Sequence, residues 1–443
     1  MEVIRIDASD LGNQAYLVTD GARAMVIDPP RPVGKVVDMV RSRGLQLEMV
    51  VDTHLHNDHV SGGPELAEAT GAVYAVCADE HVRGARGIVD GDRFEIGALV
   101  VTVKATPGHT PLHQSFVVSE GEECAVFTGG SLLIGTVGRT DLLGAGLAAS
   151  LASAQWSSVR WMLDNLPDET GVHPTHGFGS FCSSTTCAGT ETTIGAERDV
   201  NPAARLDCET FVKTLLDGFG DYPSYFAHMA PRNRKGLLPA AYLEPVPTLA
   251  AGDVEELTTR MWVIDVRPRA TFAAAHVPGT VNAGVDGPLA TYVGWTMPWG
   301  DPFALVASDE AELSRARDLL AHIGLDRPTG LSVPGPESRS GQLRLATFVE
   351  LAAEWTDDVT IIDVRRLEEW DSGHLEGAHH LAVHRLVDAE LPEGRLWLHC
   401  AVGYRAVLGA SLLLRAGREV VAIDDTWSAA SDAGLPISKV VGT

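Results

Sequence analysis

Three histidines and one aspartate lie within six residues of this chain, directly after an apolar segment. The stretch from residue 50 to 59 reads Val-Val-Asp-Thr-His-Leu-His-Asn-Asp-His, and its candidate ligands are His54, His56, Asp58 and His59. Imidazole and carboxylate groups are costly to bury without partners, whereas a divalent cation offsets that cost when they coordinate it. An apolar strand followed by a loop this rich in ligands therefore predicts a metal site.

Two later segments supply further histidines. The segment Thr-Pro-Gly-His-Thr at 106–110 presents His109 after an expected strand over Leu99–Val103, and His-Pro-Thr-His-Gly at 173–177 presents His176. Together with the first cluster, and in this order, these segments resemble the signature of the metallo-β-lactamase superfamily. The resemblance implies an α/β fold, an αββα sandwich with the ligands on loops at one edge of its sheets.

The same resemblance implies how the ligands would be shared between metal ions. In members that hold two ions, one ion is bound by the residues that match His54, His56 and His109, and the other by those that match Asp58, His59 and His176. A bridging aspartate follows the next strand in such members. This chain reads Thr-Gly-Gly there, and Gly130, which stands in place of the aspartate, has no side chain to coordinate a metal.

Residues 1–195 alternate short apolar segments with helical stretches, which predicts a layered α/β sandwich. The expected strands are Tyr16–Val18, Ala24–Ile27, Met49–Asp52, Val73–Val76, Val100–Val103 and Ser115–Val118, and a helix is expected over Val33–Arg43. Residues 202–219 and 222–229 indicate a helical tail, and the Pro-rich stretch 237–247 indicates a linker. We therefore expect the first domain to span residues 1–245.

The remaining chain contains an internal repeat with an offset of 98 residues. Ile-Asp-Val-Arg at 264–267, His276 and Gly279 return as Ile-Asp-Val-Arg at 362–365, His374 and Gly377. Two copies of a βα unit of this size imply two domains of one fold. The repeated pattern resembles the rhodanese domain, and we expect the two copies to span residues 246–350 and 351–443.

A thiol follows the central strand in the second copy, where Leu-Trp-Leu-His precedes Cys400. The N–H groups of a loop between a strand and a helix can converge on the sulfur, and the N-terminus of the expected helix Ala406–Ala416 adds partial positive charge, so the thiolate is favoured. Arg405 offers a fork for an oxyanion such as the sulfonate end of thiosulfate. The predicted catalytic residues are Cys400 and Arg405, and the predicted substrate-binding residues of the loop are Ala401, Val402, Gly403 and Tyr404.

The first copy has Ala-Ser-Asp at 307–309, where the second has its thiol loop. Without a nucleophile at this place, the first copy cannot perform the same chemistry. We expect it to be an inactive, structural rhodanese-like domain.

The whole arrangement resembles the persulfide dioxygenase–sulfurtransferase fusion family over nearly the entire chain. In that family a single Fe(II) is held by the residues that match His54 and His109 and by an aspartate at the position of Gly130. The resemblance implies oxidation of a persulfide by O₂ to sulfite, with Arg139 in the pocket of a thiol substrate such as glutathione. It also implies transfer of sulfane sulfur through a persulfide on Cys400. Fe(II) is the expected metal, and zinc is the alternative.

The composition limits the classes of partner that this chain can bind. The net charge of −25 would repel nucleic acid and anionic membranes over most of the surface. No apolar run approaches the roughly 18 residues that span a bilayer, and the N-terminal residues lack the layout of a signal peptide. We expect a cytoplasmic enzyme acting on a small persulfide, thiosulfate or a low-molecular-weight thiol, with no nucleic-acid or membrane partner, and a homo-oligomer is left open.

Two other functions stay open from the sequence. The first is a glyoxalase II-like metallohydrolase with a rhodanese tail, which needs a dinuclear zinc site. The second is a non-enzymatic N-terminal domain that only binds persulfides. Metal content separates them, because iron near one per chain favours the dioxygenase, two zinc ions the hydrolase, and no metal the binding domain. Cys182 matches a family cysteine near the metal pocket, and its role as a sulfur relay or a buried spectator is also open.

Overall fold

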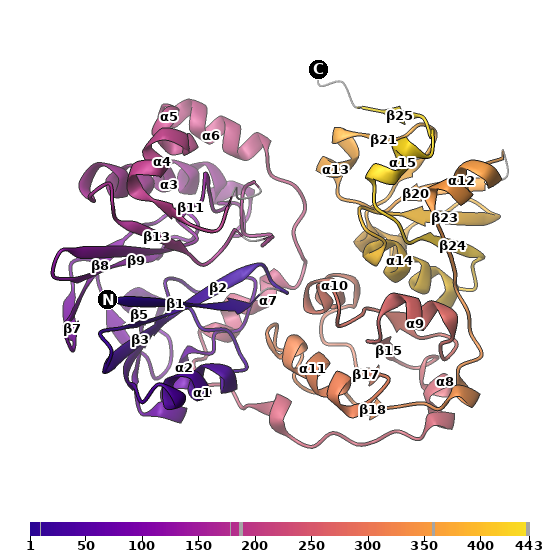
Figure 1. Ribbon diagram of the computed structural model, residues 1–443, viewed down its shortest axis with the longest axis horizontal. Helices are drawn as coiled ribbons and strands as arrows, with labels where there is room; N and C mark the ends of the chain where they lie inside the picture. The colour runs from indigo at the N-terminus through magenta and orange to yellow at the C-terminus, as the bar shows by residue number, and fades with distance from the viewer. Residues whose placement is uncertain (9, 178, 186–188, 357–358, 440–443) are drawn as a thin grey trace. The chain divides into compact units, whose positions relative to one another are not determined.

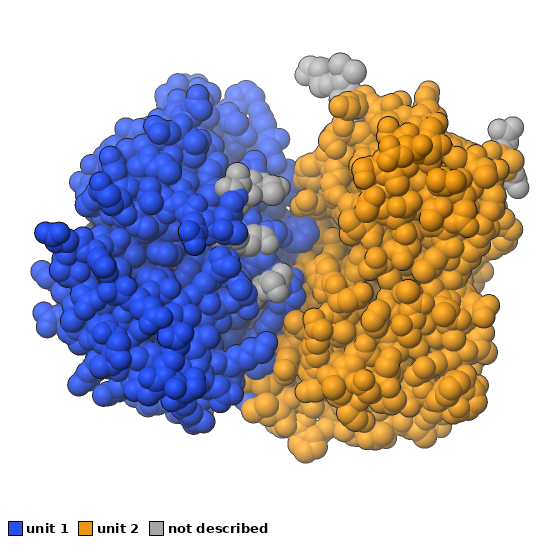
Figure 2. Space-filling model, viewed as in Figure 1, with its two compact units in different colours: residues 1–240, 321–324 blue, residues 241–320, 325–443 orange. Residues whose placement is uncertain are grey.

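The computed structural model describes residues 1–8, 10–177, 179–185, 189–356 and 359–439 (Figure 1). The chain divides into two compact units, which Figure 2 shows in different colours. Unit 1 comprises Met1–Ala240 and Ala321–Gly324, and unit 2 comprises Ala241–Leu320 and Leu325–Thr443. The division after Ala240 falls inside the expected linker. Among the described residues, no helix is both long and apolar enough to cross a membrane.

Unit 1 contains two six-stranded sheets. The first has the order β1 (Glu2–Ala8), β2 (Asn13–Thr19), β3 (Arg23–Ile27), β4 (Gln46–Val51), β5 (Val73–Cys77) and β6 (Arg86–Ile88). The second has the order β14 (Thr192–Thr193), β13 (Gly171–Pro174), β10 (Glu123–Gly129), β9 (Gln114–Glu120), β8 (Leu99–Ala105) and β7 (Arg93–Ile96). A small hairpin pairs β11 (Leu132–Leu133) with β12 (Thr136–Val137). Each strand expected in this part of the sequence overlaps an observed one.

The two sheets pack face to face through their apolar residues. Because successive side chains of a strand point to opposite faces, alternate residues of β8 are buried while Thr102 between them is exposed. The shared core takes residues from both sheets, among them Val18, Met25, Val51, Val101, Phe116 and Phe127. This core places the loops that follow β4, β8, β10 and β13 at the rims of the sheets, where they can carry polar groups.

Helices cover the outer faces of both sheets, which completes the predicted αββα sandwich (Figure 1). The first sheet is covered by α1 (Gly34–Ser42) and α2 (Gly63–Thr70), and the second by α3 (Ala145–Asn165), α4 (Ile194–Val200), α5 (Pro202–Arg205) and α6 (Cys208–Asp217). The helical tail continues with α7 (Phe226–Asn233). It is broken before Cys208, because the side chain of Asp207 accepts a hydrogen bond from the backbone of Thr210 and so starts a new helix.

Unit 2 contains two parallel sheets. The first has the order β16 (Val281–Asn282), β15 (Trp262–Asp265), β17 (Phe303–Val306) and β18 (Gly330–Ser332). The second has the order β19 (Arg344–Ala346), β24 (Val420–Ile423), β23 (Arg395–His399), β20 (Val359–Asp363) and β22 (His379–His380), and β21 (His374–Leu375) pairs with β25 (Ile437–Ser438). The sheet of the C-terminal half therefore already begins at Arg344.

The helices of unit 2 are short apart from two of 12 residues each. They are α8 (Val254–Leu257), α9 (Arg269–Ala274), α10 (Leu289–Thr296), α11 (Glu310–Ala321), α12 (Phe348–Glu354), α13 (Leu367–Ser372), α14 (Tyr404–Arg415) and α15 (Ser428–Asp432). Turns of 3-10 helix lie at Ala78–Glu80 in unit 1 and at Ala241–Leu243, Ala251–Asp253, Pro336–Ser338 and Val383–Asp388 in unit 2.

The sequence repeat corresponds to repeated contacts. In the first half, Arg267 Nε donates to Asp265 Oδ1 at 2.8 Å. At the same places in the second half, Arg365 Nε donates to Asp363 Oδ1 at 2.9 Å. All four side chains are buried, so each arginine neutralises a carboxylate at the end of a central strand. The repeated Asp-Val-Arg motif therefore supports the scaffold in both halves, whether or not a thiol follows.

Candidate metal centre and thiol loop

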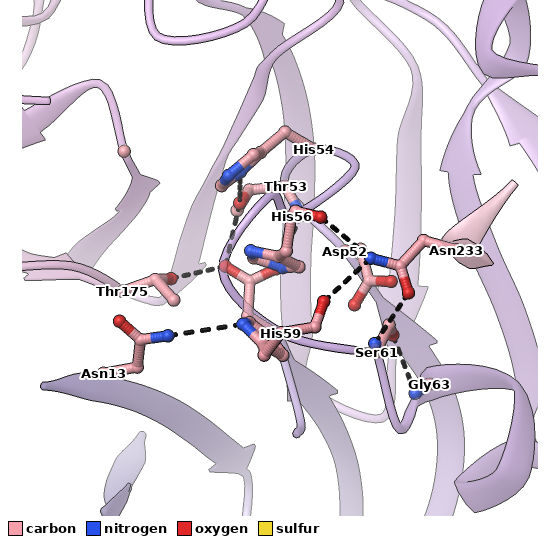
Figure 3. A network of polar contacts seen from close by, with 12 residues as sticks. Asn13, Asp52, Thr53, His54, His56, His59, Ser61, Gly63, Thr175 and Asn233 are labelled. Carbon is pink, nitrogen blue, oxygen red and sulfur yellow. Dashed lines mark hydrogen bonds and ion pairs between the residues drawn. The ribbon is translucent and has the colours of Figure 1, made fainter. Parts of the chain in front are cut away.

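The first histidine cluster lies on the loop between β4 and α2, and its side chains are buried. Asn233 of α7 holds this loop from outside (Figure 3). Its Nδ2 donates to the carbonyl oxygens of His56 at 3.0 Å and His59 at 2.9 Å, and its Oδ1 accepts from the backbone N–H of Ser61 at 2.9 Å. The helical tail is thus part of the site, because it fixes the backbone that presents the ligands.

Three imidazoles from three separate loops meet at one point. They are His54 after β4, His109 after β8 and His176 after β13, and one ring nitrogen of each lies within 4.8 Å of the other two. The Nε2 atoms of His54 and His176 are 3.4 Å apart. Among the described residues, the buried Nε2 of His109 has no hydrogen-bond partner. The sequence motifs of three segments therefore do converge in space.

Each of these three rings is oriented by a contact at its other nitrogen, Nδ1. The partners are Thr53 Oγ1 for His54 at 2.8 Å, the backbone oxygen of Arg139 for His109 at 2.7 Å, and Asn13 Oδ1 for His176 at 2.9 Å. Such contacts from outside the ligand set are what orients metal-binding histidines in proteins. Burial lowers the pKa of His109 and of His176 to about 3 and that of His54 well below its ordinary value, which favours the neutral form that binds metals.

Asp58 and His59 form a pair beside this group. Asp58 Oδ1 accepts from His59 Nδ1 at 3.0 Å, and its Oδ2 accepts from Asn13 Nδ2 at 2.6 Å. Asp58 Oδ2 also lies 3.4 Å from Nδ1 of His176, on the side of that ring away from His54. The carboxylate is therefore already shared between an amide and two imidazoles.

His56 is turned towards a different set of groups. Its Nε2 lies 3.2 Å from Asp28 Oδ1, and the carboxylate of Asp52 lies close enough to form a third possible ligand set with them. Burial alone would lower the pKa of His56, but the charge of Asp28 raises it to about 9. The structure therefore groups His54 with His109 and His176, and it pairs His56 with Asp28.

Gly130 is enclosed by two histidines. Its N–H donates to His113 Nε2 at 3.0 Å. A Cβ atom at this position would lie only 2.2 Å from Cδ2 of His109. A side chain at position 130 would therefore have to displace the His109 ring. The space that an aspartate side chain would need is occupied by this ring.

Arg139 and Cys182 lie near the histidines, but both are engaged in other contacts. Arg139 Nε and Nη2 donate to Asp141 at 2.7 and 2.8 Å, and the guanidinium lies 4.5 Å from the ring centre of Tyr222. Burial, together with the charge of Asp58, raises the pKa of the Cys182 thiol well above its ordinary value. Cys182 is therefore held as a neutral thiol.

Several residues of the site were not found from the sequence. They are Asn13, Asp28, His113, Gln155 and Asn233. Gln155 of α3 is an example, since its Oε1 accepts from the N–H of His109 at 2.7 Å and its Nε2 donates to the carbonyl of Gly130 at 3.2 Å. Only His113, four residues after His109, carries a local signal that the sequence could have offered. The others are single polar residues in distant elements.

The thiol loop of unit 2 lies between β23 and α14, with Cys400 buried at the end of the strand. The helix begins at Tyr404, two residues earlier than expected. Gly403 has a φ of +89°, and a Cβ there would lie 2.2 Å from Oδ1 of Asp424. Only glycine fits this turn. The carbonyl of Ala401 accepts from the N–H of Trp427 at 2.9 Å, and Val402 is exposed.

Arg405 faces a carboxylate. Its Nη1 and Nη2 donate to Glu369 of α13 at 2.5 and 2.8 Å. Burial alone would raise the pKa of Glu369, but hydrogen bonds and charge from Arg405 lower it to about 2. The guanidinium of Arg405, predicted to bind an oxyanion, thus links α13 to the start of α14. Binding of the sulfur donor by Arg405 stays a prediction.

The first half of unit 2 contacts the thiol loop. Tyr404 donates its hydroxyl hydrogen to the carbonyl of Gly284 at 3.2 Å. Arg269 of α9 donates through Nε to Oδ1 of Asp424 at 2.7 Å, the same oxygen that lies over Gly403. The expected structural role of the first half therefore includes support for the loop that carries Cys400.

Comparison with known proteins agrees with this architecture. The family model of the metallo-beta-lactamase superfamily matches residues 8–176, and that of the rhodanese-like domain matches residues 348–433. Persulfide dioxygenase ETHE1, mitochondrial, of Homo sapiens is 32% identical over 206 residues, which cover 45% of this chain and 74% of that protein. Hydroxyacylglutathione hydrolase of Cereibacter sphaeroides is 35% identical over 173 residues, 38% of this chain and 64% of that protein. A metallo-beta-lactamase structure from Staphylococcus aureus superposes with a TM-score of 0.67 at 24% identity, covering 75% of this chain and 99% of that chain, which supports the fold.

The paired sheets, their covering helices and the ligands on the loops define the N-terminal unit as a metallo-β-lactamase superfamily protein. Within that superfamily the chain belongs to the family of the ETHE1 persulfide dioxygenases, and a rhodanese-like domain follows in its C-terminal part.

Proposed function

We propose that this protein is an enzyme of sulfane-sulfur metabolism that combines two reactions, persulfide oxidation in unit 1 and sulfur transfer in unit 2. The observation that carries the proposal is Cys400 at the end of β23, seated at the N-terminus of α14 within a rhodanese-like domain. The relationship of unit 1 to persulfide dioxygenases supports the same area of metabolism. We place the enzyme in the cytoplasm.

Sulfur transfer begins at the Cys400 thiolate, which attacks the outer sulfur of thiosulfate. The sulfur–sulfur bond of the donor breaks, sulfite leaves with the electron pair, and Cys400 becomes a persulfide. An acceptor thiolate then attacks the outer sulfur of that persulfide and releases the Cys400 thiolate. The N–H groups of the loop and the first turn of α14 stabilise the negative charge on sulfur in both steps.

In unit 1 the proposed overall reaction takes a persulfide anion, O₂ and water to a thiolate, sulfite and two protons. The residues His54, His109 and His176 have the donor chemistry for a divalent ion, since they are neutral, buried and oriented at Nδ1. Fe(II), when bound, supplies coordination of the sulfur group and reduction of O₂. We prefer iron to zinc because zinc has no redox chemistry. Glutathione persulfide is the substrate we expect.

Two assays on the full chain test the proposal. The first measures thiosulfate:cyanide sulfur transfer by the parent and by Cys400→Ser, where we expect activity only in the parent. The second measures O₂ consumption and sulfite formation from glutathione persulfide after anaerobic loading with Fe(II). Hydrolysis of a glutathione thioester with two zinc ions per chain and no O₂ consumption would favour the hydrolase instead. Transfer activity in Cys400→Ser would remove the assignment for unit 2.

A further inference from the structure

We propose that His176 supplies the third metal ligand in place of the aspartate that the family has at the position of Gly130, so that His54, His109 and His176 form a three-histidine centre through their Nε2 atoms. The identity of the ion rests on the proposed function. The choice of ligands rests on the geometry of the described residues, and it can be tested by itself.

The hydrogen-bond partners of the three rings show which ring nitrogen carries the hydrogen. His109 Nδ1 lies 2.7 Å from a backbone carbonyl oxygen, which only accepts, so Nδ1 carries the hydrogen. The hydroxyl of Thr53 gives its single hydrogen to Asp28 Oδ2 at 2.8 Å, so its oxygen must accept from His54 Nδ1. In both rings the hydrogen is therefore on Nδ1 and the lone pair is on Nε2.

The same reasoning fixes the third ring. Asn13 donates through Nδ2 to Asp58 Oδ2 at 2.6 Å, so its Oδ1 is the atom that faces His176. An amide oxygen accepts, and His176 Nδ1 therefore carries the hydrogen. All three neutral rings are held in one tautomer, each with a bare Nε2.

The three bare nitrogens lie close together. The Nε2 atoms of His54 and His176 are 3.4 Å apart, and the three ligand atoms lie within 4.8 Å of one another in a fully buried place. Lone pairs this close repel each other unless an electrophile lies between them. Metal–nitrogen bonds of about 2.1 Å give nitrogen–nitrogen separations of roughly 3 Å, which is close to the 3.4 Å between the Nε2 atoms of His54 and His176. A divalent cation is the group that fits.

Two other histidines lie close to the three rings. His113 uses its Nε2 to accept from the N–H of Gly130. His56 Nε2 lies 3.2 Å from Asp28 Oδ1, in a separate possible ligand set with Asp28 and Asp52, although neither ring nitrogen of His56 makes a hydrogen bond among the described residues. The alternative set of His56, Asp58 and His176 also needs His176, whose Nδ1 is already committed to Asn13 and whose Nε2 faces His54. A single ion at the three-histidine set is therefore favoured over a second ion beside it.

The ligand set has a consequence for the substrate. Two histidines and a carboxylate reduce the charge of a divalent ion to +1, whereas three neutral imidazoles leave it at +2. A centre with a higher charge in a buried place binds an anionic ligand more strongly. The three-histidine set should therefore bind a thiolate or persulfide anion more strongly than a set of two histidines and a carboxylate would.

The test is anaerobic titration of the full, metal-free chain with Co(II), followed by visible absorption and calorimetry. We expect one Co(II) per chain in the parent and about 100-fold weaker binding in His176→Ala, since even a lost supporting contact typically costs 10- to 100-fold. His173→Ala is the matched control, because His173 lies on β13, the strand that precedes His176, and is not part of the cluster. Its affinity should stay within about 3-fold of the parent. Addition of glutathione should produce a sulfur-to-cobalt charge-transfer band in the parent.

Gly130→Asp separates the two ligand sets. Because position 130 is filled by the His109 ring, we expect Gly130→Asp to bind Co(II) no better than the parent and not to rescue His176→Ala. A gain in affinity or a rescue would overturn the proposal in favour of the carboxylate. So would parent-like binding in His176→Ala, or no binding by the parent.

Two further measurements keep the outcome clear. If circular dichroism shows that His176→Ala does not fold, Asn13→Ala replaces it, with about 10-fold weaker binding expected. Parent-like binding by that variant would count against the proposal. O₂ consumption is measured separately on the iron-loaded parent. If Co(II) binding does not depend on His176 but the iron-loaded parent consumes O₂, the ligand set alone is overturned. If Co(II) binding depends on His176 but the iron-loaded parent does not consume O₂, only the oxygenase function is overturned.

Discussion

In unit 1 the histidine cluster takes its side chains from loops far apart in the sequence, since His176 lies 122 positions after His54. In unit 2 the thiol loop is one continuous segment between β23 and α14. The cluster depends on outside contacts at the Nδ1 of each ring, whereas Cys400 lies on one continuous loop, whose turn at Gly403 is enclosed by Asp424 and supported by Arg269. Both sites can therefore be disturbed by changes in remote elements, but only the cluster also takes its functional side chains from several of them.

The two halves of unit 2 support the same lesson. Both keep the buried aspartate–arginine pair at the end of the central strand, Asp265 with Arg267 and Asp363 with Arg365. The strand that pairs with this central strand is β17 in the first half and β23 in the second, and only β23 is followed by a cysteine. The scaffold can therefore be kept without the cysteine, because the buried aspartate–arginine pair is common to both halves and the thiol is not.

The largest effect is expected for Cys400→Ser in the transfer assay. Because the nucleophile is lost, thiosulfate:cyanide transfer should fall by at least about 10³-fold. Co(II) binding by unit 1 should stay at the parent level, since the two centres use separate residues. A parallel loss of metal binding would show that the two centres are not independent.

His54→Ala should give the opposite pattern. Loss of a central ligand should weaken Co(II) binding by about 100-fold, because two remaining imidazoles cannot hold the ion in one geometry. Sulfur transfer by Cys400 should be unchanged, and His173→Ala again serves as the control. Unchanged cobalt affinity would mean that His54 is not a ligand.

Arg405→Ala comes next, and it separates a supporting role from a binding role. Removing the arginine takes two charged hydrogen bonds from the partly buried Glu369, which keeps its contacts with Arg366, so the free energy of unfolding should fall by about 2 kcal/mol. The double variant Arg405→Ala with Glu369→Gln should recover most of that loss. If Arg405 instead binds the donor, the double variant keeps a raised KM for thiosulfate even though its stability is restored, and urea unfolding with steady-state kinetics distinguishes the two.

The same pair predicts a dependence on acid. The pKa of Glu369 is lowered from its ordinary value of 4.5 to about 2 in the folded chain, because Arg405 outweighs the effect of burial. A lowered folded pKa contributes stability that is present above the unfolded value and is lost as pH falls towards the folded one. The parent should therefore exceed Glu369→Gln in stability at pH 5, and the difference should shrink between pH 4.5 and about 2. A constant difference in urea unfolding would contradict this.

Local patterns were sufficient to predict the strands, the sandwich and six buried residues that the structure places at or beside the candidate metal centre. They also placed Cys400 between a strand and a helix. What they missed depends on tertiary contacts. Asp28, which pairs with His56, and Gln155, which bonds His109, are single polar residues in elements remote from the motifs. Glu369 precedes Arg405 by 36 residues, and no spacing rule indicates that the two meet.

The smallest effect is expected for Cys182→Ser, which tests whether this buried cysteine of unit 1 shares in the chemistry proposed for unit 2. Burial keeps the Cys182 thiol protonated, with its pKa well above the ordinary value, so it is a poor nucleophile. Sulfur transfer should change by less than about 2-fold, and iodoacetamide at neutral pH should label Cys182 far more slowly in the folded chain than in urea. Mass spectrometry of the labelled peptides measures this directly. Fast labelling of Cys182 in the folded chain, together with a marked loss of transfer in the serine variant, would instead make it a sulfur relay, and the two centres would then be parts of one route.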